Sequence, residues 1–299
     1  MGFSSIDALV NAITVNGKFN KTQWNKITGA AAYTAGRWYN TFTLAGTPVA
    51  GNYTGTALNA QQLTDASAGA MWHGGNVSPD TKHLLNVGAV TAVATGVPST
   101  LMLVDLLMYY PGINMNVATS QSLVNGVGLP RYTTGEGVRA FLEITATTGA
   151  TAHNLSYNYT DESGNTGAVN PVTVACTASA IVPHLTHSGL AANNYGPFLP
   201  LANGDRGIRS VQSVQLSAAS GAAGTAALVL AKPLAQIPLT TLGVQSERDL
   251  LFQMPSLPKI EDGACLAWLL FTGAATAAST AAEDEVAETT AKRLLPTSP

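Results

Sequence analysis

The amino-acid sequence predicts a mainly β protein whose body is a β-sandwich of jelly-roll-like type. Short segments alternate apolar and polar residues, as strands with one buried face do, and breaks rich in Gly, Asn and Asp separate them. Apolar residues make up 46% of the 299 residues, which is enough for a sizeable core. We expect an N-terminal helical and extended assembly arm over residues 1–80, the sandwich body over 81–282, and an acidic-to-basic tail over 283–299.

The arm is expected to begin with a short helix from Ser4 to Thr14. Apolar residues recur there at helical spacing, Ser4 or Ser5 can cap the first turn, and Asn16-Gly17 ends the helix. Four cations and several aromatic residues follow before residue 60. Because so few cations cannot replace the counterions of a nucleic acid, this composition favours a packing or subunit-contact arm.

Several segments of the body have the alternation of strands. They cover residues 138–147, 155–160, 169–176, 210–217 and 225–231. Two further runs, residues 101–110 and 264–271, are apolar at both odd and even positions. Because successive side chains of a strand point to opposite faces of the sheet, both faces of these strands need cover. In a sandwich one face meets the opposite sheet. The other must meet an extra layer or a neighbouring subunit.

Charge is scarce throughout the chain. The sequence has 14 Lys and Arg against 17 Asp and Glu, a net charge of −3, and charged residues are only 10% of the total. About a quarter is usual, and this balance argues against both a disordered chain and a nucleic-acid binder. Residues 163–204 contain no charged residue at all. Because interface cores are depleted in charge, we expect other chains to cover much of this surface.

The two ends of the chain carry opposite charge. The N-terminal arm is basic, whereas the tail is acidic over residues 283–288. The ends could therefore meet across a subunit boundary, and the alternative is that each end folds back on its own body.

The cysteines and the N-terminus indicate the compartment. Cys176 and Cys265 each lie in an apolar run, so we expect two small buried hydrophobes rather than a disulfide framework. The N-terminus lacks the basic and apolar regions of a signal peptide. No run of about 20 solidly apolar residues predicts a membrane span. The product is expected to be made in a cytoplasm, with no membrane partner.

Three motifs match catalytic or ligand-binding patterns only in part. His73-Gly74-Gly75 has the letters of an esterase oxyanion loop, but the sequence has no Gly-x-Ser-x-Gly elbow. Residues 135–140 read Gly-x-Gly-x-x-Ala, but a strand pattern follows them instead of a helix. His184 and His187 could share a metal only with further ligands, and Cys176 is the only candidate nearby. We therefore predict no catalytic, cofactor-binding or metal site.

Two polar turns also match ligand-binding patterns only in part. Residues 203–207 could present Asp205 and Arg206 to a partner or a sugar, although a plain loop before a strand is the simpler interpretation. Residues 161–165 resemble a calcium loop loosely but lack the EF-hand spacing, so no calcium is assigned.

Asp105 is a charged residue at an unusual position in the sequence. It lies on the same parity as Leu103 and Leu107 inside an apolar strand. A buried carboxyl group must be ion-paired or hydrogen-bonded, or its pKa rises. It could be a catalytic acid or a structural ion pair. We predict a buried side chain with an arginine partner or at least two hydrogen bonds.

Four phrases of the sequence resemble structural (virion) proteins of tailed bacteriophages, of the auxiliary head or capsid type. They are residues 101–112 (LMLVDLLMYYPG), 129–137 (LPRYTTGEG), 199–201 (LPL) and 262–268 (DGACLAW). The resemblance covers most of residues 70–275 and includes no catalytic signature. It implies a non-enzymatic component of the virion without a cofactor. The long charged spine helix of tailed-phage major capsid proteins has no counterpart here, which favours an auxiliary protein.

The resemblance and the composition together predict a capsid decoration or minor capsid protein. Such a protein would stabilise the shell by burying surface against copies of itself and against other virion proteins, such as the major capsid protein. Apolar burial contributes about 25 cal/mol per Å², and repetition over a lattice multiplies it. The alternative is a tail, collar or fibre component that contacts the host surface. A hydrolase comes third, because no nucleophile motif is present.

Overall fold

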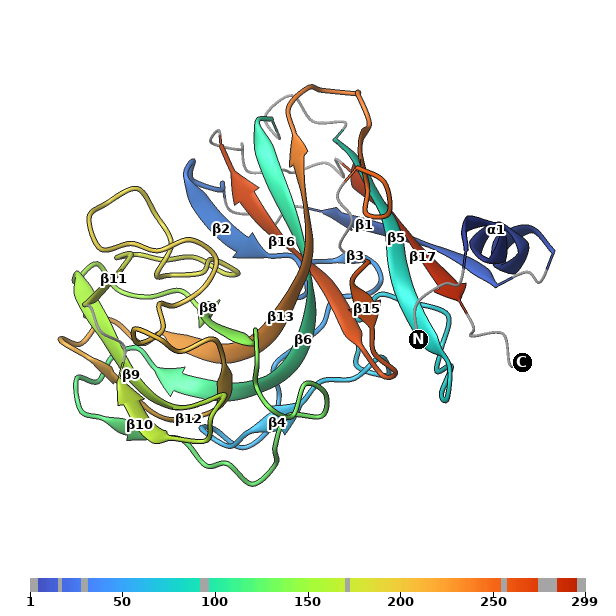
Figure 1. The fold of residues 1–299 in the computed structure, drawn as a ribbon. Helices are drawn as coiled ribbons and strands as arrows, with labels where there is room; N and C mark the ends of the chain where they lie inside the picture. The colour runs from blue at the N-terminus through green and yellow to red at the C-terminus, as the bar shows by residue number, and fades with distance from the viewer. Residues whose placement is uncertain are drawn as a thin grey trace.

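The computed structural model describes residues 5–15, 18–27, 32–91, 97–169, 173–253, 257–273 and 284–294. The elements in this described part are one α-helix and seventeen β-strands, and the ladders between the strands are antiparallel. This confirms the predicted mainly β fold class. Three sheets build the molecule, and we name them the central, terminal and lateral sheets (Figure 1).

The central sheet contains both runs that are apolar on both parities. Its strand order is β2 (Arg37–Asn40), β16 (Cys265–Thr272), β6 (Ser99–Asn114), β13 (Thr225–Leu239) and β8 (Arg139–Ala146), with β4 (Gln61–Gln62) also paired to β6. The apolar runs are β6 and β16, which pair with each other inside the sheet. Their position explains their composition, because side chains on both faces are buried.

The other two sheets flank the central sheet. The terminal sheet has the order β14 (Ser246–Asp249), β5 (Thr81–Thr91), β17 (Asp284–Leu294), β1 (Phe19–Ile27) and β3 (Gly46–Thr47), with β15 (Lys259–Ile260) paired to β5. The lateral sheet has the order β10 (Thr166–Val169), β9 (His153–Asp161), β12 (Ile208–Leu216) and β7 (Gln121–Ser122), with β11 (Val174–Cys176) paired to β9.

A short segment closes the central sheet into a barrel. This closing segment, residues 183–188, hydrogen-bonds to β2 on one side, where Leu185 N donates to Trp38 O at 2.9 Å. On its other side it hydrogen-bonds to β8, where Ile144 N donates to His184 O at 3.0 Å. Bridges pair Tyr39 with His184 and Glu143 with Leu185. The two edges of the central sheet are thereby joined, and closure leaves no open edge at this point.

Side chains of alternate residues fill the interior of this barrel. The strands β2, β16, β6, β13 and β8 contribute to this buried cluster, as do the closing segment and the loops over the barrel ends: Trp38, Phe42, Leu63, Val104, Leu106, Tyr109, Phe141, Leu185, Ala227, Val229, Ala231, Cys265, Ala267 and Leu269. The interior is therefore a packed core in its own right.

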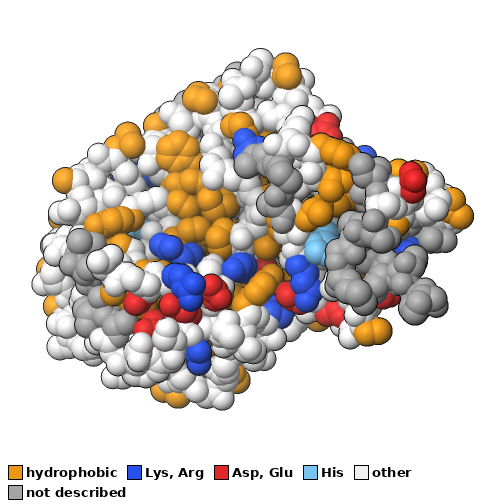
Figure 2. All heavy atoms as spheres, viewed as in Figure 1, with side chains coloured by type: hydrophobic (Ala, Val, Ile, Leu, Met, Phe, Trp, Pro, Cys, Tyr) orange, Lys and Arg blue, Asp and Glu red, His pale blue; other side chains and the backbone are white. Residues whose placement is uncertain are grey.

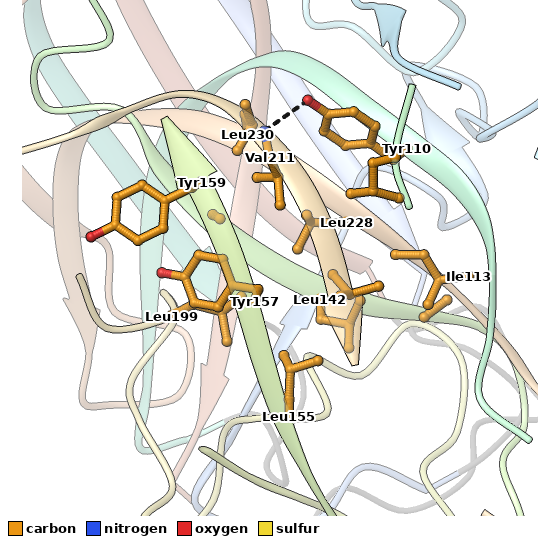
Figure 3. Close-up of a cluster of buried hydrophobic side chains, with 14 of the residues drawn as sticks. Tyr110, Ile113, Leu142, Leu155, Tyr157, Tyr159, Leu199, Val211, Leu228 and Leu230 are labelled. Carbon is orange, nitrogen blue, oxygen red and sulfur yellow. Dashed lines mark hydrogen bonds between the residues drawn. The ribbon is translucent and has the colours of Figure 1, made fainter. Parts of the chain in front are cut away.

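The opposite face of the central sheet carries two separate cores. Against the terminal sheet it packs residues such as Leu103 and Trp268, and the Trp268 ring lies 6.5 Å from that of Trp24 on β1. Against the lateral sheet it packs Tyr110 and Leu228, as Figure 3 shows. The strands β6 and β13 reach both cores, with register shifts between them. The two flanking sheets thus cover neighbouring halves of one face, as in two sandwiches sharing a layer.

The predicted N-terminal helix is present as α1 (Ile6–Thr14). Ser5 caps it by accepting a hydrogen bond from Ala8 N at 3.1 Å, as expected for an N-cap serine. Its predicted end, Asn16-Gly17, lies outside the described residues. With nine residues, α1 is too short for a bilayer, and the described part of the chain contains no helix that fits a membrane span.

The structure does not show a free N-terminal arm. The strands β1 and β3 belong to the terminal sheet, and β2 and β4 belong to the central sheet. The acidic tail is also a strand, because β17 lies between β1 and β5. Lys26 is opposite Glu285 in this pairing. The oppositely charged ends therefore meet within one chain and not across a subunit boundary. The division of the chain at residues 80 and 282 stays a prediction.

Candidate functional site: charged loops beside an uncharged face

Asp105 lies where the two outer cores meet. Its side chain is 0% exposed, and Arg131 donates to both carboxylate oxygens, from Nε at 2.9 Å and from Nη2 at 2.7 Å. Cys265 N donates to the same carboxylate at 2.9 Å. Burial raises the pKa of Asp105, and Arg131 opposes that shift. The predicted buried ion pair is confirmed, and with both oxygens occupied this carboxylate has the contacts of a structural residue.

Three loops that are distant in the sequence contact one another. They are residues 132–137, 161–165 and 203–209, two of which the sequence marked as separate polar turns. Glu136 forms a β-bridge with Gly207. Glu162 Oε2 accepts hydrogen bonds from Arg206 N at 3.0 Å and from Gly207 N at 3.2 Å. Any side chain at Gly207 would collide with this arrangement, because an added Cβ would lie 1.9 Å from Gly135 O.

The meeting of these loops concentrates charge on a surface that otherwise has little. We name the group the charged loop cluster. It contains Glu136, Asp161, Glu162, Asp205, Arg206 and Arg209 on the loops, with Arg139 on β8 and Lys232 on β13 next to them. These residues are eight of the 31 charged residues of the chain, four of each sign. Figure 2 shows charged side chains in a band across the lower middle of this face, with hydrophobic side chains gathered above the band.

Arg206 and Glu136 are the outermost pair of the cluster. Arg206 Nη1 lies 3.3 Å from Glu136 Oε1, and the two side chains are 68% and 59% exposed. Arg206 Nε lies 3.6 Å from Glu162 Oε1. The loops beneath are fixed through the backbone, since Arg209 Nε donates to Thr134 O and Glu162 O. Asp205 accepts from the Tyr159 hydroxyl at 2.5 Å. The cluster therefore presents an exposed ion pair on a rigid base.

An apolar face lies on the residues around the closing segment, and the half-buried Arg37, opposite Thr272 in the pairing of β2 with β16, lies next to it. We define the apolar face as Ile181, Val182, Leu190, Phe198 and Phe271, which are exposed or half-buried. Leu190 is 82% exposed and packs over Gly36, whose N–H donates to Thr272 O at the end of β16. Phe271 packs on Trp38 with ring centroids 5.4 Å apart. The first four members belong to residues 163–204, the stretch without charge.

The histidines of the closing segment do not form a metal site. His184 and His187 are fully buried, and burial lowers their pKa values to about 3 and about 4. His187 Nδ1 accepts a hydrogen bond from Leu142 N at 3.5 Å, and its Nε2 donates to Pro197 O at 3.3 Å. Within the part of the chain that the structure describes, no three His, Cys, Asp or Glu side chains are grouped to hold a metal ion.

One Ser–His pair is present that was not predicted from the sequence. Ser188 Oγ lies 3.4 Å from His184 Nε2, but Ser188 also donates to Leu185 O at 2.7 Å and accepts from Trp38 N at 3.0 Å. His184 Nδ1 has no hydrogen-bond partner, so no carboxylate orients this ring. Both residues are 0% exposed. The pair therefore lacks the third member and the access that an acyl-transfer nucleophile needs.

His73 is part of a buried polar contact beside the terminal sheet. Its Nδ1 lies 2.6 Å from Lys82 Nζ, which also donates to Gly75 O at 2.5 Å. Burial, with Lys82 nearby, lowers the pKa of His73 to about 4. The Gly75 carbonyl is therefore engaged as an acceptor of the lysine, which is the opposite of an oxyanion hole that offers N–H donors.

Cys176 and Cys265 are free thiols in buried positions. Burial raises the pKa of Cys176 to about 12 and raises that of Cys265 further. Neither thiol is therefore ionised near neutral pH, and both act as the small buried hydrophobes that were predicted.

Glu143 is the one carboxylate inside the barrel among the described residues. It accepts hydrogen bonds from Asn40 Nδ2 at 2.7 Å, from the Tyr53 hydroxyl at 2.8 Å and from Thr43 Oγ1 at 3.0 Å. Burial raises the pKa of Glu143 to about 7, and these three donors limit the rise. The ionised form is disfavoured because burial removes it from water and the neutral donors compensate only in part.

We expect Glu143→Gln to stabilise the protein at pH 8 by about 1–3 kcal/mol and to give no gain at pH 5. The folded-state pKa lies above the unfolded value, so the contribution of Glu143 is present at low pH and is lost as pH rises through 7. Urea unfolding at both pH values measures the difference, with Glu261→Gln on the surface as the control. An equal effect of Glu143→Gln at both pH values would contradict this assignment.

Comparison with known proteins yields little. No protein-family model matches the chain, and no curated protein matches it. Among solved structures the chain is similar to the infectious bursal disease virus VP2 subviral particle, with 10% sequence identity and a TM-score of 0.19. The match covers 98% of this chain and 87% of that chain. A TM-score this low carries no argument, so function has to be argued from this chain's own residues.

Proposed function

We propose that this protein is a non-enzymatic component of a virus particle, a capsid decoration or minor capsid protein. It stabilises the shell by burying its apolar face against copies of itself and other virion proteins, such as the major capsid protein. The observation that supports the proposal is the combination of Leu190, 82% exposed, with a loop region that carries no charge. Large apolar patches on a protein surface mark interaction sites.

The physical chemistry of this face favours a permanent contact. Burying apolar area contributes about 25 cal/mol per Å². Residues 163–204, which supply four of the five residues of the face, contain no charge that would have to be desolvated. The loops of the face are already ordered by hydrogen bonds to β2 and β8. Little conformational freedom is therefore lost on docking, which favours affinity.

The side chains that could do chemistry support a non-enzymatic role. Ser188 and His184 are buried without a carboxylate, and the thiols of Cys176 and Cys265 have raised pKa values. Asp105 is occupied by Arg131. Each of these groups has a structural contact that competes with a catalytic role.

A tail, collar or fibre component that contacts the host is the second candidate. Trp72 favours it, because this side chain is 61% exposed while Trp24, Trp38 and Trp268 are buried. An exposed indole is a surface on which a sugar ring can stack. Immunogold electron microscopy of purified particles separates the candidates. Label on the head supports the first proposal, label on the tail supports the second, and intact particles without label overturn both.

Leu190→Asp is expected to weaken binding to neighbouring subunits at least tenfold. Burial of a leucine side chain contributes about 1.5–3 kcal/mol, and a tenfold change corresponds to about 1.4 kcal/mol. Sedimentation of the purified chain and co-sedimentation with particles measure the loss. The matched control is Val127→Asp, which adds the same charge in the loop between β7 and β8. Equal binding of the Leu190 variant and the control would remove the apolar face from the assembly surface.

A further inference from the structure

The charged loop cluster is not explained by the stability of a single chain. Its outermost ion pair, Arg206 with Glu136, is exposed on both sides, and such surface pairs typically contribute about 0–1 kcal/mol. Yet the fold brings three loops together to place this pair, with Glu162 clamped by two backbone N–H groups. A rigid, exposed ion pair of this kind is prepared for a contact outside the chain.

The signs of the charges define what that contact can be. The cluster has four cations and four anions, so it suits neither a polyanion nor a strongly basic partner. A patch with both signs side by side is complementary to a copy of itself. In a two-fold contact residue i of one copy meets residue j of the other, and j meets i.

We propose that the charged loop cluster is a two-fold contact between copies of this chain, in which Arg206 of each copy faces Glu136 of the other. This inference rests on the proposed assembly function and names the partner of one of its surfaces. Arg206 has donors to spare, because a guanidinium carries five N–H groups and its printed contacts use only Nη1 and Nε.

The neighbourhood of the cluster fits an interface between copies. Figure 2 shows hydrophobic side chains gathered directly above a band of charged side chains on the face in view. Interfaces commonly combine an apolar centre with a polar and charged rim. The charged loop cluster has the place of such a rim, where complementary charges set the register of the two copies.

The test uses two charge reversals in the full-length chain, Arg206→Glu and Glu136→Arg. In a two-fold contact each single variant brings two like-charged pairs together, so self-association is expected to weaken at least tenfold. In a hetero-dimer of the two variants, the reversed side chain at position 206 of one copy faces the reversed side chain at position 136 of the other, so these two charges are opposite. The second contact joins the unchanged Glu136 of the first variant to the unchanged Arg206 of the second. Self-association is therefore expected to return to the wild-type value, as hetero-dimers.

Analytical ultracentrifugation at 0.05 M and 0.5 M salt reads out the result, and high salt is expected to weaken the wild-type contact. Circular dichroism confirms that each variant is folded. Recovery on mixing cannot come from the ion pair within one chain, because that pair stays broken in both variants. The matched control is Lys259→Glu, a reversal at an exposed ion pair with Glu261 outside the cluster, which should change nothing.

Three outcomes would overturn the two-fold contact: wild-type protein that stays monomeric, single reversals that associate like wild type, or a mixture that does not recover. If the reversals have no effect while Leu190→Asp abolishes assembly, the proposed function stands and this contact fails. If particles carry no label, the proposed function fails, and recovery on mixing still decides whether the copies meet through the charged loop cluster.

Discussion

Replacing Arg131 by alanine is expected to lower the free energy of unfolding by about 3–5 kcal/mol, which is the typical loss when one partner of a buried ion pair is removed. The reason is geometric. Asp105 is 0% exposed and would keep a buried charge without its two strongest hydrogen bonds. Asp105→Ala should cost a similar amount, because Arg131 would lose its counter-charge while still donating to Leu63 O and Leu106 O.

Urea unfolding at pH 7.5 measures both variants, and Arg139→Ala is the control. Arg139 donates a single long hydrogen bond, to Leu199 O at 3.4 Å, so its loss should change stability far less. The double variant Asp105→Leu/Arg131→Met should recover much of the loss, since apolar pairs of similar volume often replace buried ion pairs without cost. Single variants that unfold at the wild-type urea concentration would show that the pair does not hold the two cores together.

Asp105 also shows how far the sequence could predict this fold. Parity alone placed it inside an apolar strand, and burial then required a partner. The same reasoning predicted cover on both faces for β6 and β16. That cover is the barrel interior on one face and the two outer cores on the other. These predictions succeeded because they depend on local alternation, which is visible in the sequence.

Features that depend on contacts between distant segments were not predictable in the same way. The closing segment begins with Pro183 and contains two histidines, so its local sequence is typical of a loop. It is buried only because β2 and β8 both pair with it. The acidic tail was expected to dock, either on a neighbouring subunit or on the chain's own body, but its partner strand could not be predicted. Its partner β1 is separated from it by almost the whole chain.

The charged loop cluster could be predicted from the sequence only in part. Two of its three loops, residues 161–165 and 203–207, were visible in the sequence as polar turns, but nothing local indicated that Glu136 and Arg206 would meet. The available signal was the opposite charge of two turns in a chain with few charges. Opposite charge reduces the number of loops that could lie next to each other but does not identify the pair, because surface charges contribute little to the choice of a fold.

Acid is expected to destabilise this protein steeply between pH 6.5 and 4, because three buried histidines are held neutral. Burial lowers the pKa values of His73 and His187 to about 4 and that of His184 to about 3. Their folded-state pKa values lie below the unfolded value of 6.5, so below pH 6.5 the unfolded chain binds the additional protons. The stability is fully present above pH 6.5 and is lost as pH falls towards 4.

Glu143 has the opposite effect on the pH dependence of stability over part of this range. Its folded-state pKa of about 7 means that the folded chain holds the additional proton between pH 4.5 and 7. Near pH 5 the three histidines and this carboxyl group together give a net uptake of about two protons on unfolding, or about 2.7 kcal/mol per pH unit.

Urea unfolding at pH 7.5, 6 and 5 measures this dependence of stability on pH. His187→Gln should reduce it by about one proton, since the glutamine amide does not titrate. Stability that stays constant down to pH 4.5 would mean that these rings are already protonated in the folded chain, and the closing segment could then not be packed around neutral histidines.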